Sequence, residues 1–262
     1  MEGLSCWVTS QGWIFLLDPL LLKTFLWDPI TLRQVRLPSM EINLPKECKC
    51  LLSEQPTDPN CSVVIIDPTN SIFWYCHPGE NKWVKHKSSC YSKINLDRIA
   101  VVMGKIYHYD ICNEKIEIFE FSPFSNIITF PIKKYNFPAG RNMCQDYLLE
   151  SRGELFLVFF WFLRFSIRTI AHICAWKMDF SKQSWFPVES LGDQVFFVSG
   201  MSRFAASARE LGVKKNCIYF VNSDDKNLHI FDMEEGTIAT HHPCPNLSVS
   251  WCEPFLMMPT SR

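Results

Sequence analysis

Hydrophobic residues along this chain occur in short runs that are separated by turn-forming residues. Five segments repeat one pattern: a run of aromatic and β-branched residues, a turn rich in Asp, Pro, Gly, Ser or Asn, and a second short run. They begin at Thr24, Ile72, Ile116, Cys174 and Leu228. Aromatic and β-branched side chains suit a half-buried strand, and the turn residues adopt the backbone angles of a tight reversal. The pattern therefore predicts five β-hairpins.

Two further strand-like runs precede each hairpin. The nearer runs begin at Gly12, Ser62, Gly104, Gly153 and Asn216, and the farther runs are SCWVTS, KCLLSE, RIAVVM, DYLLES and QVFFVS. Glycine and asparagine tolerate the positive φ of a tight turn into a strand, which explains their place at the start of four of the nearer runs. Each repeating unit therefore has four strands.

The unit recurs every 45 to 57 residues, measured between Trp27, Trp74, Phe119, Trp176 and Phe231. A four-stranded unit of this period is typical of a β-propeller of kelch or WD type, in which each blade covers its neighbour. The sequence thus predicts an all-β, kelch-like propeller as a single domain over residues 1–262. We expect five complete four-stranded blades near 4–38, 48–88, 97–133, 145–189 and 194–243, and Pro254–Pro259 as the remnant strand of a closing sixth blade.

Bulky rings at matching places in these units are predicted to fill the space between blades. They are Trp27, Trp74, Trp83, Phe119, Trp176, Trp185 and Phe231. An aromatic cage around a cation is the alternative for the stretch FWYCHPGENKW, residues 73–83, because indole faces attract cations. We favour the scaffold interpretation for its two tryptophans.

Two segments test the all-β prediction. Residues Ser202–Gly212 carry the Ala and Leu spacing and the glycine stop of one short helix or turn, placed between strands of the fifth blade. The most apolar run, LFLVFFWFL at Leu155–Leu163, is far shorter than the roughly 20 residues that a membrane-spanning helix needs. A buried strand is favoured there over membrane association.

The composition of the chain narrows the classes of partner and the cellular compartment that we expect. The chain has 262 residues, 47% hydrophobic and 20% charged, with a net charge of -1. A chain of this length buries a sizeable core without disulfides, and the absence of a basic surplus disfavours nucleic acid as a partner. The N-terminal residues lack the basic region of a signal peptide, so we expect the twelve cysteines to be mainly reduced and the protein to be intracellular, in the cytoplasm or nucleus.

The motif search predicts no catalytic residue, no metal site and no cofactor. Candidate metal ligands do occur close together in the sequence, but none forms the CxxC pair of familiar zinc modules. They are Cys48 with Cys50, Cys76 with His77, His86 with Cys90, and His241 and His242 with Cys244. Nucleophile-elbow and phosphate-loop motifs are missing from the sequence. Six aspartates lie near predicted strand ends: Asp18, Asp28, Asp67, Asp110, Asp179 and Asp232. Turn capping is their favoured role, and an acidic catalytic ring at one mouth of the channel is the alternative.

One hairpin tip stands out as a candidate contact surface. His77, Glu80, Asn81 and Lys82 are polar and follow a buried-type strand. Polar loops on rigid scaffolds often carry binding, although a solvated turn is the simpler interpretation. These four residues are the weak candidates for a partner-binding site.

Three stretches resemble a known family. Leu51–His86, Trp176–Ser199 and Glu210–Phe220 are similar to plant F-box proteins with a C-terminal kelch-like propeller of a domain-of-unknown-function type. The resemblance implies a protein-binding propeller that selects a substrate protein for a cullin-type ubiquitin ligase. Its residues would do no chemistry, because other subunits of such a complex do it.

The chain departs from that family pattern at its start, where MEGLSCWVTSQGW is not an F-box. We therefore do not expect docking on a Skp-type adaptor, and we expect either a tight five-blade ring or an open fragment with unpaired edges. The alternative functions are a propeller hydrolase or lectin that binds a small ligand at the channel mouth, and a fragment with no selected activity.

Overall fold

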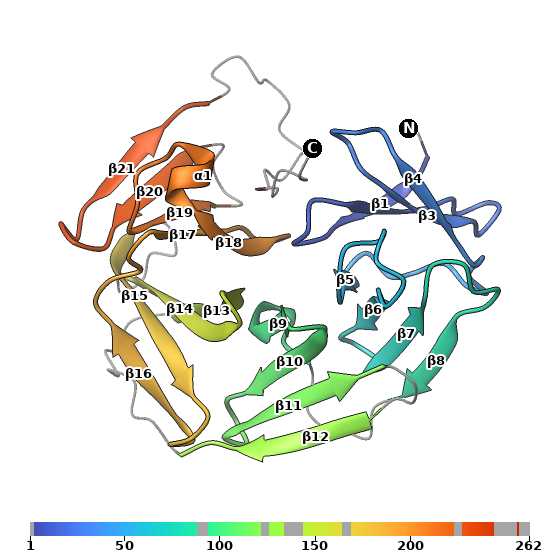
Figure 1. Ribbon diagram of the computed structural model, residues 1–262, viewed down its shortest axis with the longest axis horizontal. Helices are drawn as coiled ribbons and strands as arrows, with labels where there is room; N and C mark the ends of the chain where they lie inside the picture. The colour runs from blue at the N-terminus through green and yellow to red at the C-terminus, as the bar shows by residue number, and fades with distance from the viewer. Residues whose placement is uncertain are drawn as a thin grey trace. The chain divides into compact units, whose positions relative to one another are not determined.

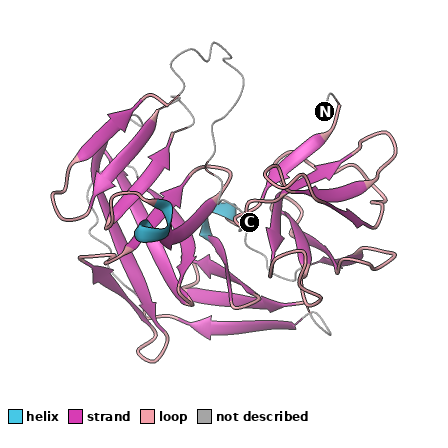
Figure 2. Cartoon of the chain, turned by 45° about the horizontal axis from the view of Figure 1, so that its top comes forward, coloured by secondary structure: helices cyan, strands magenta, loops and turns pink. Residues whose placement is uncertain are grey.

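The computed structural model describes residues 3–87, 94–121, 126–133, 144–163, 169–222, 227–243 and 256. Its regular structure is almost entirely β, with only two short helical segments in these ranges, η1 (Leu96–Arg98) and α1 (Ala208–Leu211) (Figure 2). The predicted all-β fold of five blades is confirmed.

Each blade is one sheet, named A to E in chain order (Figure 1). Sheet A holds β1 (Ser5–Val8), β2 (Ile14–Leu17), β3 (Thr24–Trp27) and β4 (Gln34–Leu37). Sheet B holds β5 (Lys49–Leu52), β6 (Val63–Asp67), β7 (Ile72–Cys76) and β8 (Val84–Lys87). Sheet C holds β9 (Ile99–Val102), β10 (Lys105–Asp110), β11 (Lys115–Glu120) and β12 (Asn126–Pro131).

Sheet D holds β13 (Cys144–Ser151), β14 (Glu154–Phe162), β15 (Ile170–Asp179) and β16 (Ser184–Val188). Sheet E holds β17 (Gln194–Val198), β18 (Arg203–Ser207), β19 (Cys217–Val221), β20 (Leu228–Asp232) and β21 (Ile238–His241). The chain divides into two compact units: the first contains sheets A, B and C, and the second contains sheets D and E.

The turns that lead into the second strands have the expected backbone. Gly12, Gly104, Gly153 and Asn216 have φ angles of 83°, 76°, 78° and 56°. A side chain with a Cβ is strained in this left-handed region, which explains why glycine or asparagine occupies these positions.

Sheet E differs from the prediction. Half of the segment expected to be a helix, Arg203–Ser207, is strand β18, which pairs antiparallel with β17, and only Ala208–Leu211 is helical, ending at Gly212 with φ 65°. Because β18 reverses the chain, β17 pairs parallel with β19. The ring of Phe204 stacks on Phe197 at 4.7 Å, so cross-strand packing outweighs the local helix propensity.

The apolar run from residue 155 to 163 lies almost entirely in β14, whose residues Leu155–Phe160 are all buried. A strand whose sheet is covered on both faces needs apolar side chains on both sides. Its sequence is therefore an unbroken hydrophobic run rather than an alternating one. Among the described residues, no helix is long and apolar enough to cross a membrane.

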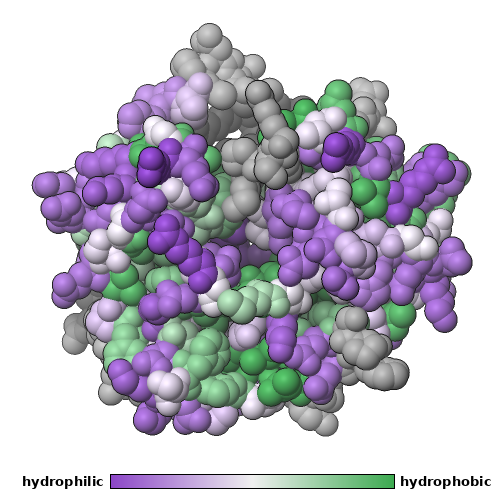
Figure 3. All heavy atoms as spheres, in the orientation of Figure 1, coloured by the Kyte–Doolittle hydropathy of each residue, from purple (hydrophilic) through white to green (hydrophobic). Residues whose placement is uncertain are grey.

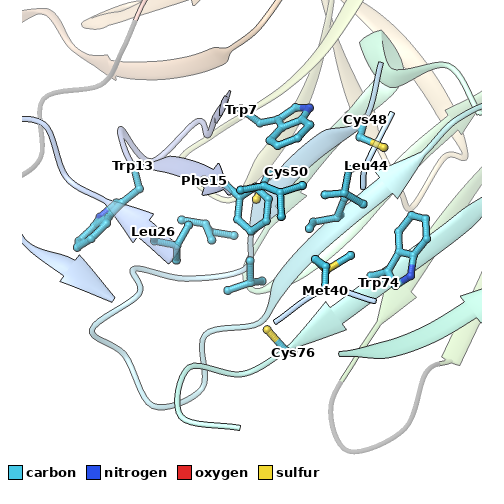
Figure 4. Close-up of a cluster of buried hydrophobic side chains, with 14 of the residues drawn as sticks. Trp7, Trp13, Phe15, Leu26, Met40, Leu44, Cys48, Cys50, Trp74 and Cys76 are labelled. Atoms are coloured by element: carbon cyan, nitrogen blue, oxygen red, sulfur yellow. The ribbon is translucent and has the colours of Figure 1, made fainter. Parts of the chain in front are cut away.

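Side chains of sheets A and B form the largest apolar cluster of the first unit (Figure 4). Phe15 is fully buried, and its ring lies 5.6 Å from that of Trp7 and edge-on to Trp83 at 6.1 Å. From sheet B, Cys50, Ile65 and Trp74 lie side by side on one face. Large rings from one sheet therefore fill the gaps left by smaller residues of the other.

Equivalent clusters join the other neighbours within each unit. Phe73 of sheet B contacts Phe119 of sheet C at 4.9 Å, and Phe160 of sheet D contacts Phe220 of sheet E at 5.1 Å. Edge-to-face and offset ring pairs of this kind add about 0.5–1.5 kcal/mol to the hydrophobic burial. Each sheet interface inside a unit is thus an aromatic core.

The aromatics expected between blades occupy several environments. Trp74 and Trp83 belong to the cluster of sheets A and B, Phe119 to that of B and C, and Phe231 to that of D and E. Trp176 and Trp185 are buried within sheet D, and Trp27 is half-buried on β3. The predicted remnant strand Pro254–Pro259 lies outside the described residues except for Leu256, which is in no regular element.

Four thiols lie in or beside this core. Cys48, Cys50, Cys61 and Cys76 are buried, and all belong to the cluster of sheets A and B. Burial raises the pKa of Cys48 to about 12, with Asp67 and Glu47 adding to the effect, and raises that of Cys61 to about 11. Burial likewise raises the pKa of Cys50 and Cys76 above its ordinary value. These thiols pack as small apolar groups.

Replacing Phe15 with alanine tests the core of sheets A and B. Because Phe15 is fully buried, Phe15→Ala should lower the free energy of unfolding by about 3–5 kcal/mol. Leu20→Ala, at a residue that is 91% exposed, should change it by about 0.5 kcal/mol or less. Urea unfolding followed by tryptophan fluorescence measures both, and equal losses would contradict the described core.

Thiol labelling tests the burial of the cysteines. In the folded protein at pH 8, iodoacetamide should modify the exposed Cys6, Cys112 and Cys144. The four buried thiols of the cluster of sheets A and B should stay unmodified, because the thiolate is the reactive form and a raised pKa suppresses it. All should react in denaturant. Peptide mass mapping assigns each site, and native labelling of Cys50 at the rate of Cys6 would refute the packing.

Candidate interaction surface

The outer hairpin of sheet B contains the candidate tip. Its strands β7 and β8 pair antiparallel, with Trp74 opposite Lys85 and Ile72 opposite Lys87. The connecting residues 77–83 are mainly exposed. The hairpin therefore presents a polar loop on a strand pair whose inner member is anchored in the core.

Two of the four predicted tip residues build the turn itself. The backbone N–H of His77 donates to Oε2 of Glu80 at 2.9 Å, and the backbone N–H of Glu80 donates to the carbonyl oxygen of His77 at 3.1 Å. Gly79 between them has φ 93°, a conformation that favours glycine. The Glu80 carboxylate thus acts as the internal cap of the turn.

The imidazole of His77 is tied to a neighbouring loop. Its Nδ1 lies 3.0 Å from the carbonyl oxygen of Cys61 and 3.4 Å from Oγ of Ser62. A carbonyl only accepts, so Nδ1 carries the proton and donates to Cys61. His77 therefore anchors the turn to the loop between β5 and β6 and is half-buried.

The other two predicted residues face solvent. Asn81 and Lys82 are exposed, and neither has a hydrogen bond or ion pair among the described residues. Of the four candidates, these two are therefore available to a partner, whereas His77 and Glu80 hold the loop in shape.

The two tryptophans that flank the loop are fixed in the scaffold. Trp74 is 5% exposed, and the indole N–H of Trp83 donates to the carbonyl oxygen of Pro38 at 2.7 Å. The Lys85 amine lies over the Trp74 ring at 5.8 Å, inside the range of a cation–π contact. The stretch from residue 73 to 83 is therefore a core element with an exposed tip.

The structure adds Lys85 and Lys87 to this surface, and the motif search missed both. They are exposed and lie on the same face of β8, because strand side chains alternate. The available signal was the alternation V-K-H-K, which marks an edge strand with one cationic side. Together with Lys82 they form the β8 lysine strip, defined as Lys82, Lys85 and Lys87.

Aspartates near strand ends cap turns, as the sequence predicts. Each carboxylate accepts hydrogen bonds from backbone N–H groups two or three residues further on. This arrangement holds for Asp18, Asp28, Asp67, Asp179 and Asp232. The Ser181 hydroxyl lowers the pKa of Asp179 to about 2, and Lys214 lowers that of Asp232. A general acid needs a raised pKa, so these two carboxyls are unsuited to that role.

The alternative of one acidic ring does not fit the positions of these residues. Asp18 follows β2 and Asp28 follows β3, and the two strands are antiparallel. The carboxylates consequently lie at opposite ends of sheet A, and the six aspartates cannot share one mouth.

The cysteine and histidine pairs of the sequence are the candidates for a metal site. Within the described ranges, no three His, Cys, Asp or Glu side chains are grouped closely enough to hold a metal ion. Cys90 and Cys244, which the sequence pairs with His86 and with His241 and His242, lie outside the described residues.

Sheet D carries a shallow hollow of about 400 Å³. Its walls include Glu154, Lys177, Phe180 and Phe186, and hydrophobic side chains gather over β15 and β16 in Figure 3. Lys177 and Glu154 form an ion pair at 2.6 Å, so the charges in the hollow neutralise one another. This leaves little polar selectivity for a small ligand.

Comparison with known proteins gives the family. The model of the KIB1-4 beta-propeller family matches residues 1–234. F-box protein At2g26160 of Arabidopsis thaliana is 29% identical over 192 residues, which are 67% of this chain and 56% of that protein. F-box protein At4g35733 of the same species is 26% identical over 194 residues, 68% of this chain and 50% of that protein. The chain thus spans about half the length of these curated relatives.

Among solved structures, a virginiamycin B lyase from Staphylococcus aureus is similar over 94% of this chain and 72% of that one, with 10% identity and a TM-score of 0.44. A likeness this low carries no functional argument. The match to the family model covers most of the chain, and two plant F-box proteins align with two thirds of it. This chain therefore belongs to the KIB1-4 beta-propeller family.

Proposed function

We propose that this propeller binds a protein partner through the outer hairpin of sheet B and selects that partner for a cullin-type ubiquitin ligase. Family membership carries the proposal, together with the F-box proteins among the relatives. Their names identify them as F-box proteins, which supports a protein-interaction role, and the link to a ubiquitin ligase is what the family resemblance of the sequence implies.

The hairpin suits such a role physically. Its core side is fixed by Trp74 and Trp83, and its turn is fixed by His77 and Glu80. A loop that is already ordered loses little conformational entropy when a partner binds. Asn81 and Lys82 then supply a hydrogen-bonding amide and a cation on a rigid support.

An intracellular location, in the cytoplasm or nucleus, is part of the proposal. None of the nine described cysteines forms a disulfide, although four of them share one core. Free thiols in a stable core are usual where glutathione and thioredoxin keep thiols reduced.

The double substitution Asn81→Ala, Lys82→Ala tests the surface. A matched control is Arg33→Ala, Gln34→Ala, which removes one cation and one amide from the equivalent hairpin of sheet A. Affinity capture from plant extract with quantitative mass spectrometry should identify a protein that binds the wild type and the control, and whose recovery from the tip variant falls about tenfold.

Ligase selection needs a second measurement. The captured protein should have a shorter half-life in cells that express this chain fused to an F-box than in cells that express the fused tip variant. Equal recovery on all three baits would refute the surface. An unchanged half-life, with the Skp-type adaptor captured by the fusion, would refute the role in ubiquitin transfer.

A further inference from the structure

Strand β8 is the outer edge of sheet B. The sheet order is β5, β6, β7, β8, and within the described residues no strand lies beyond β8. Alternate backbone N–H and C=O groups of an edge strand point away from its neighbour, so an edge can accept one more strand.

The lysines on this edge have no counter-charge in the part of the chain that the structure describes. No carboxylate of the described residues lies within ion-pair distance of Lys82, Lys85 or Lys87. Four lysines of other blades do have counter-charges: Lys105 pairs with Glu120 at 2.5 Å, Lys177 with Glu154 at 2.6 Å, Lys182 with Asp179 at 3.4 Å, and Lys214 with Asp232. Oε2 of Glu80 caps the turn, and no ion pair joins Glu80 to Lys82.

We propose that β8 receives an acidic, extended segment of the partner protein, which adds to sheet B as a further strand. The inference rests on the proposed function and names the chemistry of the partner. Side chains on one face of a strand repeat every two residues, so acidic residues at alternate positions of the segment lie directly across from Lys85 and Lys87. Lys82 lies in the turn that leads into β8 and is exposed.

The same lysines exclude other strands. A hydrophobic or basic strand that paired with β8 would bury or repel uncompensated cations, which is how edge lysines prevent aggregation. An acidic strand is the one sequence type that converts this penalty into cross-strand attraction. The same lysines therefore protect the edge from aggregation and select an acidic partner strand.

A polyanionic nucleic acid fits this edge less well. Single-stranded nucleic acids bind where aromatic side chains stack on their bases. Trp74 is buried and Trp83 is half-buried against sheet A, so neither ring of the hairpin offers a free face. The backbone edge also has donors and acceptors spaced for a peptide rather than for phosphates.

Fluorescence anisotropy with the full chain tests the proposal. The probe is a fluorescein-labelled ten-residue peptide in which Glu alternates with Thr, titrated at low salt. The double reversal Lys85→Glu, Lys87→Glu should weaken binding about tenfold or more, because two attractive cross-strand pairs become repulsive. The matched reversal Arg33→Glu, Arg36→Glu, at exposed positions at and near β4, should change Kd by less than about twofold.

Altered probes separate strand addition from simple charge attraction. A peptide with Gln in place of Glu should bind about tenfold more weakly, because the ion pairs are lost. Two further peptides keep every Glu and carry N-methyl groups either on the Glu residues or on the Thr residues. One of the two should bind weakly, because only one set of backbone N–H groups faces β8 and methylation removes those donors. Raising the salt should weaken the Glu peptide most.

Several outcomes would overturn the inference. The wild type would not bind the Glu peptide, or the Lys85→Glu, Lys87→Glu variant would bind it equally well. The two N-methylated peptides would bind equally, or a single-stranded oligonucleotide would bind more tightly than the peptide in a lysine-dependent way. If the charge-reversed variant fails to fold by circular dichroism, Lys85→Gln, Lys87→Gln replaces it. Partner capture that depends on Asn81 and Lys82 while the peptides fail would leave the proposed function standing and reject only the acidic segment.

Discussion

A four-stranded sheet of this kind has two apolar faces, and neither can be left in water. Strand β6 shows the consequence most directly, since all five of its residues are buried. Val63 and Ile65 enter the cluster with sheet A, whereas Val64 and Ile66 enter the cluster with sheet C. Sheet B is stable because both neighbours cover it, and each buried Val or Ile contributes about 1.5–3 kcal/mol. The repeat in the sequence exists because of this mutual burial.

The same constraint determines where function can lie. Burial falls from the inner strands to the outermost ones: β6 is fully buried, β8 alternates between half-buried and exposed, and β21 is exposed throughout. Outer strands and turns can therefore change their chemistry without opening the core. The lysine strip lies on such an outer strand, β8, although its paired strand β7 contributes Trp74 to the cluster of sheets A and B.

Features with a local cause could be predicted from the sequence. Strand alternation, glycine at positive φ in Gly12 and Gly104, and aspartate capping at Asp67 all depend on residues near in the chain. Features that depend on a distant partner could not. Strand β18 forms because β17 is available for pairing, and His77 is held by a carbonyl 16 residues away. The sequence therefore located the hairpin tip but could not separate its structural residues from its exposed ones.

Rigidity of the hairpin has a consequence for the kind of binding it supports. The turn, the two tryptophans and the edge strand are held by contacts that exist before any partner arrives. The conformational cost of association then falls mainly on the incoming segment, which must leave a disordered ensemble to become a strand. Exposed lysines add attraction that salt screens and that discriminates by charge more than it adds affinity. An edge with these properties would favour selective and reversible capture of the segment proposed above.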